Sequence, residues 1–262
     1  MKDVQNMGDT RGIAIQRVGI SKAWLPFLVA AEKRDSQNVT ALIERFTVDL
    51  PMEYKGTHMS RFIEILHEYA NKPLNFSAVD ELLTEALDKL AAKSAHIAIS
   101  FKYFVAKEAP VSAKESLLDI DCTFIGDKRE NMPLEFTMEI SVPVTSLCPC
   151  SKEISKYGAH NQRSTVKAAV KFSQENELTI EKLTTIIEGQ ASSSVYPILK
   201  REDEKYVTET AYENPKFVED ILRDLVLALR SLEKIDYFSI ECENFESIHN
   251  HNAYAAHQEY RN

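Results

Sequence analysis

The chain has 262 residues, of which 44% are hydrophobic and 27% charged, which is ordinary for a globular protein. Its 31 basic and 40 acidic residues give a formal net charge of −9, which argues against general nucleic-acid binding, since that needs a basic face. A small anionic ligand in a local basic pocket remains compatible with this charge. No apolar run is long enough to span a membrane and the N-terminus lacks an apolar signal segment, so we expect a cytoplasmic protein with no membrane partner.

The first half of the chain predicts two strands, two helices and two further strands. Alternating apolar and polar side chains indicate strands at residues 13–20, 39–50, 96–105 and 116–126. Between the second and third of these strands, apolar residues recur at helical spacing over residues 57–70 and 77–92. The helices therefore each carry one apolar face for a sheet to cover.

The second half repeats this order of elements without repeating the sequence. Strands are expected at 134–144, 165–173 and 237–245, and helices at 180–190 and 214–234. We expect Pro143 to end the first of these strands, because proline cannot donate to a central ladder. We expect Asn214 to cap the long helix and Pro215 to occupy its first position.

The repeated order β-β-α-α-β-β predicts an α+β fold with antiparallel sheets and helices on one face. The polar segment around residues 126–132 is the natural boundary between the halves. We therefore expect two modules, residues 1–126 and 133–262, of which the second carries most candidate site residues.

The four cysteines fall into two classes. Cys122 and Cys242 lie singly in predicted strands, as expected of small buried hydrophobic residues. Cys148 and Cys150 lie two residues apart in a polar loop, too close for an easy mutual disulfide, which indicates metal binding or catalysis. His160 follows in the same loop, and a thiolate with an imidazole suits a transition metal. Spacing alone leaves open a free cysteine pair in a surface turn.

Other segments could complete a site. The acidic stretch 199–209 looks like a loop and could donate a carboxylate, although such a stretch taken alone is more often a solvated charged loop. Glu246, His249 and His251 follow the last predicted strand, where they could carry protons or form a plain polar tail. Glu219 begins the long helix, where the helix dipole favours a carboxylate. A carboxylate there could also accept two parallel N–H bonds from a heterocycle such as guanine.

With these residues in view, the chain resembles the prokaryotic type IB GTP cyclohydrolase I family over nearly its whole length. The resemblance is carried, in order, by the runs KGTHMSRF (55–62), PVTSLCPCSKEIS (143–155), YGAHNQRS (157–164), LKR and DEKYVTE (199–209), AYENPKFVED (211–220) and ENFESIHNH (243–251). No motif position that carries chemistry departs from the family pattern.

The resemblance implies a tunnelling fold (T-fold) built of two tandem modules, and a homotetramer with active sites at subunit interfaces. It implies a hydrolase acting on C–N bonds of a cyclic amidine. That enzyme converts GTP to 7,8-dihydroneopterin triphosphate and formate, the first step of tetrahydrofolate and pterin biosynthesis. One divalent ion per active site is implied, and the mixed ligand set suits Zn²⁺, Mn²⁺ or Fe²⁺.

The resemblance also implies residue roles. The metal ligands would be Cys148, His160 and Glu204, with water in the fourth position. The catalytic residues would be Cys148, Cys150, Glu246, His249 and His251. Glu219 would anchor the guanine, and the cations flanking the site, candidates for the triphosphate, are Arg163, Lys200, Arg201 and Lys205, with Lys152 and Arg61 as further candidates. Some of these cations would instead be ordinary surface charge.

Three other functions remain open at this level. A nitrile reductase of the same fold would use a cysteine as covalent nucleophile and would need NADPH. A non-catalytic metal-binding or purine-sensing protein would bind GTP without releasing formate. Cys148 and Cys150 could also be merely structural. The His-x-His of residues 249–251 and the segment around Glu204 favour the metal enzyme over the reductase.

Overall fold

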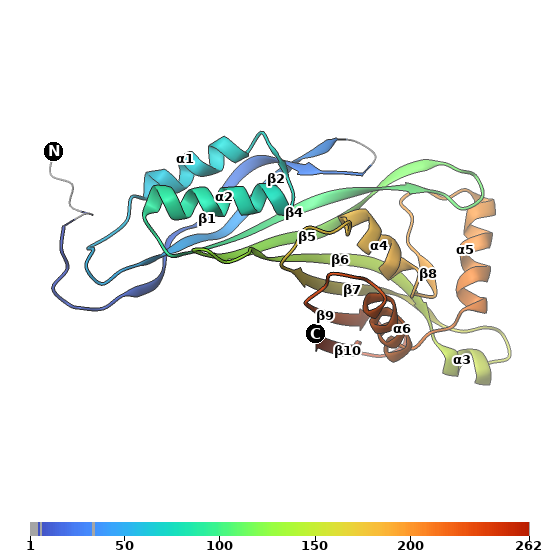
Figure 1. Ribbon diagram of the computed structural model, residues 1–262. Coiled ribbons are helices and arrows are strands. Elements are labelled where there is room, and N and C mark those ends of the chain that lie inside the picture. Colours follow the sequence, from blue (N-terminus) through green and yellow to red (C-terminus); the bar gives the residue numbers. More distant parts are fainter. Residues whose placement is uncertain (1–4, 6, 33–34, 262) are drawn as a thin grey trace. The chain divides into compact units, whose positions relative to one another are not determined.

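The structure is a computed structural model that describes residue 5, residues 7–32 and residues 35–261 (Figure 1). Its described residues form an α+β fold, as predicted. The helices are α1 Met59–Tyr69, α2 Phe76–Leu90, α3 Pro149–Ile154, α4 Ile180–Glu188, α5 Arg201–Glu213 and α6 Val218–Arg230. The strands are β1 Ile15–Ala30, β2 Ser36–Leu50, β3 Pro73–Leu74, β4 Ser94–Glu108, β5 Glu115–Arg129, β6 Glu135–Leu147, β7 Asn161–Phe172, β8 Ser193–Ser194, β9 Tyr237–Asn244 and β10 Ala253–Tyr260. None of the described helices is both long and apolar enough to cross a membrane.

The strands follow the hydrogen-bonded order β10-β9-β7-β6-β5-β4-β2-β1-β3, with β8 paired to β6. The chain divides into two compact units, and strands β4 to β7 contribute to both. The first unit takes in the described residues up to Lys102, with Cys122–Met138 and Lys171–Glu177. The second takes in Tyr103–Asp121, Glu139–Val170 and the described residues from Leu178 onward. Every candidate site residue except Arg61 belongs to the second unit.

The first unit packs two amphipathic helices on one face of an antiparallel strand pair. β1 pairs antiparallel with β2, β2 pairs antiparallel with β4, and the short β3 runs parallel to β1. Helices α1 and α2 contact each other and these strands (Figure 1). Phe62 of α1 meets Phe46 of β2 edge-on with ring centroids 5.0 Å apart, and both side chains are fully buried. Burying such aromatic side chains is the main source of stability for this face.

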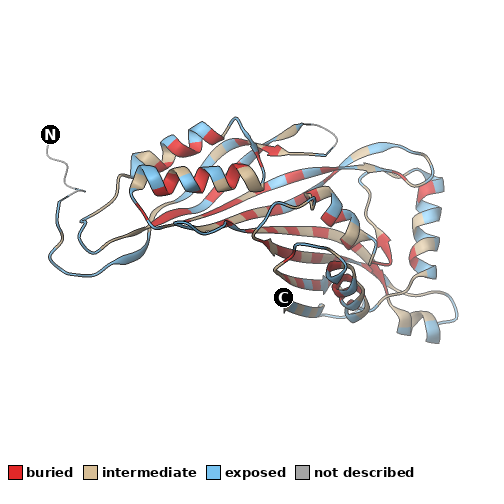
Figure 2. Cartoon of the chain, viewed as in Figure 1, coloured by how far each residue is buried: buried red, intermediate tan, exposed pale blue. Residues whose placement is uncertain are grey.

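The second unit contains helices α4 and α6. Helix α6 contacts α4, β9 and β10, and its residues Ile221, Leu225 and Leu229 are fully buried. Along β6 the buried positions alternate with partly exposed ones, as Figure 2 shows. Strands β9 and β10 pair antiparallel, with Asn244 opposite Ala253. The buried positions of β6 and the apolar face of α6 thus belong to the core.

Four local predictions were wrong. Residues 201–213 form helix α5 rather than a loop, and residues 149–154 of the predicted loop form helix α3. β6 continues through Pro143, because the buried alternation from 136 to 144 outweighs one missing ladder donor. Asn214 is the C-cap of α5, and α6 starts only at Val218 with Phe217 as its N-cap. The last strand, β10, was missed by the sequence analysis.

The prediction that the two single cysteines are buried is confirmed. Cys122 and Cys242 are buried inside β5 and β9. Burial raises the pKa of the Cys242 thiol to about 12, as expected for an inert core thiol. Cys148 is partly exposed, Cys150 is exposed, and neither forms a disulfide.

Candidate active site

The loop between β6 and β7 holds Cys148 and His160 together. Cys148 follows the last residue of β6 and is the N-cap of α3, whereas His160 immediately precedes β7. The backbone N–H of Cys148 donates to the carbonyl oxygen of His160 over 3.1 Å. The two residues therefore sit opposite each other where two neighbouring strands end, which is the kind of rigid position that functional side chains need.

Ser151 forms hydrogen bonds to both Cys148 and His160 within this loop. Its hydroxyl donates to the Cys148 carbonyl oxygen over 3.2 Å and accepts the backbone N–H of His160 over 3.1 Å. Its own backbone N–H donates to the Cys148 sulfur over 3.4 Å. The short helix α3 thus places its first turn against the sulfur, and one hydroxyl links Cys148 to His160.

The His160 ring is held from behind by polar groups. Its Nδ1 lies 2.9 Å from Oε1 of Gln162 and 3.8 Å from a carboxylate oxygen of Glu246. The His160 and Glu246 side chains are each 13% exposed, so this contact is largely screened from water. With Nδ1 engaged, Nε2 is the ring nitrogen that could bind a cation or exchange a proton.

A buried polar chain supports Gln162. Its amide nitrogen lies 2.7 Å from the Ser146 hydroxyl, which lies 2.9 Å from the Ser164 hydroxyl. Ser164 in turn lies 2.7 Å from Oδ1 of Asn244 in β9. All four side chains are buried. None of them was singled out from the sequence, although Gln162 and Ser164 share the inward alternation of β7 with Val166 and were therefore readable as buried.

Glu204 is exposed and lies in the first turn of α5, next to the buried residue Asp203. The Asp203 carboxylate accepts the backbone N–H groups of Val111, Ser112 and Lys200, each over 2.8 Å, and the Ser112 hydroxyl over 2.6 Å. Burial alone would raise the pKa of Asp203, but these hydrogen bonds outweigh it and hold the pKa far below its usual range. Asp203 thereby anchors the start of α5 to the connection between β4 and β5.

The other end of α5 docks near Cys148. The Lys152 ammonium donates to the Tyr212 carbonyl oxygen and lies 4.4 Å from the Tyr212 ring centroid. Glu204 precedes Tyr212 by two helical turns, which is about 12 Å along the axis. In the described part of the chain, no three His, Cys, Asp or Glu side chains gather closely enough to hold a metal ion. The structure therefore brings Cys148 and His160 together and leaves Glu204 apart from them.

The donor chemistry of the pair fits a transition metal. A thiolate sulfur and an imidazole nitrogen are both ligands that zinc accepts, and the second ring nitrogen of His160 already has the acceptor that metal-binding histidines usually have. A third protein ligand would have to come from a residue outside this pair.

His249 and His251 lie in the turn between β9 and β10 and are exposed. Their rings stack with centroids 5.2 Å apart and planes 16° from parallel. Glu246 begins the same turn, but the histidine it contacts is His160 rather than either member of this pair. These three residues, adjacent in the sequence, are thus divided in the structure, with Glu246 beside His160 and the two histidines paired in the exposed turn.

Glu219 occupies the first turn of α6 and is exposed. Its neighbour Asp220, rather than Glu219, accepts the N-cap N–H of Phe217 over 3.0 Å. Because Asp220 makes the capping hydrogen bond, the Glu219 carboxylate is available to a ligand.

The candidate phosphate-binding cations differ in their surroundings. Arg163, Lys200, Arg201 and Lys205 are exposed. Lys205 lies 3.7 Å from Glu209, and this exposed pair contributes little to stability. Arg61 belongs to the first unit and donates to the Lys89 carbonyl oxygen over 2.7 Å. Arg61 and Lys152 therefore already have structural roles at helix ends.

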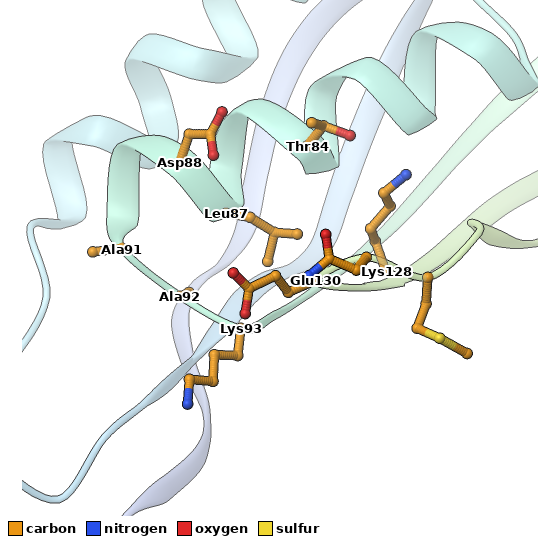
Figure 3. Close-up of a pocket in the computed structure, with 10 residues that line it drawn as sticks. Thr84, Leu87, Asp88, Ala91, Ala92, Lys93, Lys128 and Glu130 are labelled. Carbon is orange, nitrogen blue, oxygen red and sulfur yellow. The ribbon is translucent and has the colours of Figure 1, made fainter.

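A cavity of about 600 Å³ lies elsewhere, in the first unit. Figure 3 shows Thr84, Leu87 and Asp88 of α2 on one side of it, with Lys93, Lys128 and Glu130 opposite. None of the candidate site residues lines this cavity. Its size alone therefore does not make it the place of the chemistry suggested by Cys148 and His160.

A model of the type I GTP cyclohydrolase FolE2 family matches residues 1–255. The chain is 50% identical over 256 residues to GTP cyclohydrolase FolE2 of Geobacter sulfurreducens, covering 98% of this chain and 97% of the relative. It is 49% identical over 253 residues to GTP cyclohydrolase FolE2 of an Azoarcus species, covering 97% of this chain and 93% of the relative.

Among solved structures, the fold is similar to uricase from Arthrobacter globiformis, with a TM-score of 0.56 and 9% identity, covering 94% of this chain and 93% of that chain. It is similar to a urate oxidase from Bacillus sp. TB-90, with a TM-score of 0.53 and 10% identity, covering 94% of this chain and 100% of that chain. Urate oxidases have the T-fold, so this likeness shows the fold class and nothing about the reaction.

Proposed function

Since this chain belongs to the type I GTP cyclohydrolase FolE2 family, we propose that it hydrolyses and rearranges GTP to 7,8-dihydroneopterin triphosphate and formate. The observation that carries the proposal is the juxtaposition of Cys148 and His160 inside a family match that spans residues 1–255. A thiol and an imidazole at adjoining strand ends could supply two of the protein ligands of a metal that activates water for attack on a purine ring.

Cys148 and His160 would hold a divalent cation, and Glu204 is the proposed third ligand. When bound, such a cation supplies the Lewis acidity that makes water a competent nucleophile at neutral pH. Glu204 stands apart from the pair in the described chain, so we propose that the set is completed on assembly, in a homotetramer with active sites between subunits. Zn²⁺, Mn²⁺ and Fe²⁺ all suit a set that mixes sulfur, nitrogen and oxygen.

Glu219 would bind the guanine. Its carboxylate can accept the N1–H and the exocyclic amine of the base in two parallel hydrogen bonds, a geometry that a carboxylate matches well. The first turn of α6 is a rigid support for such an anchor. Holding the base there would fix where the C8 atom lies, and misplacement by about 1 Å can cost about 10²-fold in rate.

The exposed cations Arg163, Lys200, Arg201 and Lys205 would bind the triphosphate. The stacked pair His249 and His251 would move protons, first to N7 of the imidazole ring as C8 is attacked. Glu246 would act on the His160 side of the site, because its carboxylate lies 3.8 Å from Nδ1 of His160. A positioned acid or base typically contributes about 10²–10⁴-fold. Cys150 is exposed near Cys148, and we propose it as a second active-site thiol.

Finer features of the proposal rest on the sequence resemblance. These are the prokaryotic type IB subdivision, the action on a cyclic amidine C–N bond, a tandem pair of β-β-α-α-β-β modules divided near residues 126–133, and a cytoplasmic location.

The test is to supply the metal-loaded protein with GTP and to detect pterin fluorescence after oxidation. We expect fluorescence that requires Zn²⁺ or Mn²⁺ and that disappears with a chelator. A nitrile reductase would instead consume NADPH in the presence of a deazaguanine nitrile and leave GTP intact. A purine-sensing protein would bind GTP and produce neither signal, and either result would contradict the proposal.

A further inference from the structure

We propose that Gln162 is a positioning residue that fixes the His160 ring with hydrogen on Nδ1, and that Ser146, Ser164 and Asn244 fix Gln162 in turn. The inference rests on the proposed function in one respect, because the open Nε2 is the atom that would meet a cation. It deepens that function by identifying the hydrogen bond that sets the tautomer of His160 in the absence of any ligand.

The geometry gives Gln162 two different neighbours. Its Oε1 lies 2.9 Å from Nδ1 of His160, and its Nε2 lies 2.7 Å from the Ser146 hydroxyl oxygen. The Gln162 side chain is only 8% exposed, so water cannot replace a lost partner easily. An amide oxygen can only accept a hydrogen bond, so in this orientation the His160 nitrogen that faces it must carry the hydrogen.

The hydroxyl groups behind Gln162 support this orientation of its amide. The Gln162 amide nitrogen donates to the Ser146 hydroxyl oxygen, and the Ser164 hydroxyl lies in donor position 2.9 Å from the same oxygen and 2.7 Å from Oδ1 of Asn244. The single hydrogen of Ser164 can serve only one of these two acceptors at a time, and in either case the Ser146 oxygen accepts from Gln162.

Four buried groups thus share in holding the Gln162 amide. Turning the amide over would place its N–H against Nδ1 and its oxygen against Ser146, which would then have to donate its hydrogen to that oxygen. A buried polar network favours one arrangement of its side chains when every polar group in it has a hydrogen-bond partner. The carboxylate of Glu246, 3.8 Å from the same Nδ1, also favours hydrogen on that nitrogen.

Three full-length variants separate positioning from packing. Gln162→Met keeps the volume and removes the acceptor. Gln162→Glu keeps an acceptor for the Nδ1 hydrogen and is the rescue variant. Gln190→Met is the matched control, because the Gln190 amide donates to the Ile186 carbonyl oxygen at the end of α4 and belongs to no part of the His160 network. Far-UV circular dichroism and the thermal midpoint establish that each variant is folded.

The first readout is the His160 tautomer, measured by two-bond ¹H–¹⁵N correlation on protein labelled with ¹⁵N-histidine. The chain has seven histidines, so His160 is assigned by comparison with His160→Gln. The second readout is the affinity of metal-free protein for Zn²⁺, by competition with a chromophoric chelator. Loss of such an outer partner typically weakens metal binding by about 10–100-fold.

We expect hydrogen on Nδ1 in wild type, with and without zinc, and in Gln162→Glu and Gln190→Met. We expect mixed tautomers and about 10–100-fold weaker zinc binding in Gln162→Met, with zinc binding in Gln162→Glu at or above that of wild type. Hydrogen on Nε2 in metal-free wild type would overturn the inference, as would Gln162→Met matching wild type in both readouts. If wild type binds no zinc yet carries hydrogen on Nδ1, the proposed metal function fails while the positioning role stands. If Gln162→Met does not fold, the wild-type tautomer and the Gln162→Glu result decide the question.

Discussion

The backbone N–H of Cys148 donates to the carbonyl oxygen of His160 over 3.1 Å, a main-chain contact across the loop that involves neither side chain. Cys148→Ala should therefore keep this contact while it removes the sulfur and the hydrogen bond that the sulfur accepts from the Ser151 N–H. We expect it to lose bound metal and to lower GTP turnover to background, with an unchanged circular dichroism spectrum. Metal analysis and the pterin assay are the measurements. Cys122→Ala, a buried cysteine of β5, is the control that should keep both, and a Cys148→Ala protein with full metal content would rule out the proposed ligand role.

Asp203 should control stability through the start of α5. Asp203→Asn leaves one acceptor oxygen where the carboxylate accepts hydrogen bonds from Val111, Ser112 and Lys200. We expect a thermal midpoint lower by several degrees at neutral pH, whereas Glu202→Gln on the exposed face of the same turn should leave it unchanged. Because α5 carries Glu204, zinc affinity should fall together with stability.

The same substitution has a predictable pH dependence. Hydrogen bonds lower the pKa of Asp203 below its ordinary value of 3.8, so the folded state holds fewer protons than the unfolded state in acid. The stabilising contribution of the carboxylate is therefore complete above pH 3.8 and is lost as the pH falls toward the lowered pKa. Urea unfolding of wild type and Asp203→Asn should differ clearly at pH 7 and converge in strong acid. If the difference in unfolding free energy between wild type and Asp203→Asn grew on acidification, the lowered pKa of Asp203 would be contradicted.

Glu219 should act on binding rather than on folding. Its carboxylate is exposed and takes no part in capping α6, so Glu219→Gln should leave the thermal midpoint unchanged. Hydrogen bonds to a charged group are worth about 1.5–3 kcal/mol, so the affinity for GTP should fall about 10–100-fold. Calorimetric titration with a GTP analogue whose purine ring resists hydrolysis at C8 measures this affinity. Glu233→Gln is the exposed control. Equal affinity in wild type and Glu219→Gln would show that the guanine is anchored elsewhere.

Gly126 allows α2 to approach β5 in the first unit. A Cβ atom at this position would lie 2.7 Å from Cγ1 of Val79 and 2.9 Å from Cδ1 of Leu83, closer than packed atoms tolerate. Gly126→Ala should destabilise the protein by about 1–3 kcal/mol through overpacking, as measured by denaturant unfolding. Gly189→Ala, where a new Cβ would lie 3.4 Å from the Thr185 carbonyl oxygen, should be close to neutral. Equal stability of the two variants would mean that α2 and β5 can separate at no cost.

The fold was predictable where buried positions recur at regular spacing, because apolar residues then repeat with the same spacing in the sequence. Helices α1, α2, α4 and α6 each bury an apolar stripe, and their existence follows from that spacing. Helix α5 buries only Asp203 and Ala211, so it has no stripe to detect and owes its start to the Asp203 hydrogen bonds. Strand β10 has no buried residue and is held by its pairing with β9, which alternation along one segment cannot reveal.

The site was predictable in its chemistry and less so in its geometry. The motif around Cys148 and His160 identified two residues that the structure does place together. Gln162 and Ser164 were missed because polar side chains in a strand read as solvent-facing, although they share the inward phase of Val166. Which histidine Glu246 would contact depended on the path of the turn after β9, and that path has no signature in the residue types.

The central claim is that the protein opens the purine ring of GTP at C8, and the fate of C8 tests it most directly. GTP labelled with ¹³C at C8 should yield one labelled formate for each GTP consumed when the metal-loaded enzyme acts on it, followed by ¹³C NMR. His160→Ala and the chelated wild type should release none. Consumption of GTP without labelled formate, or full release by His160→Ala, would contradict the account.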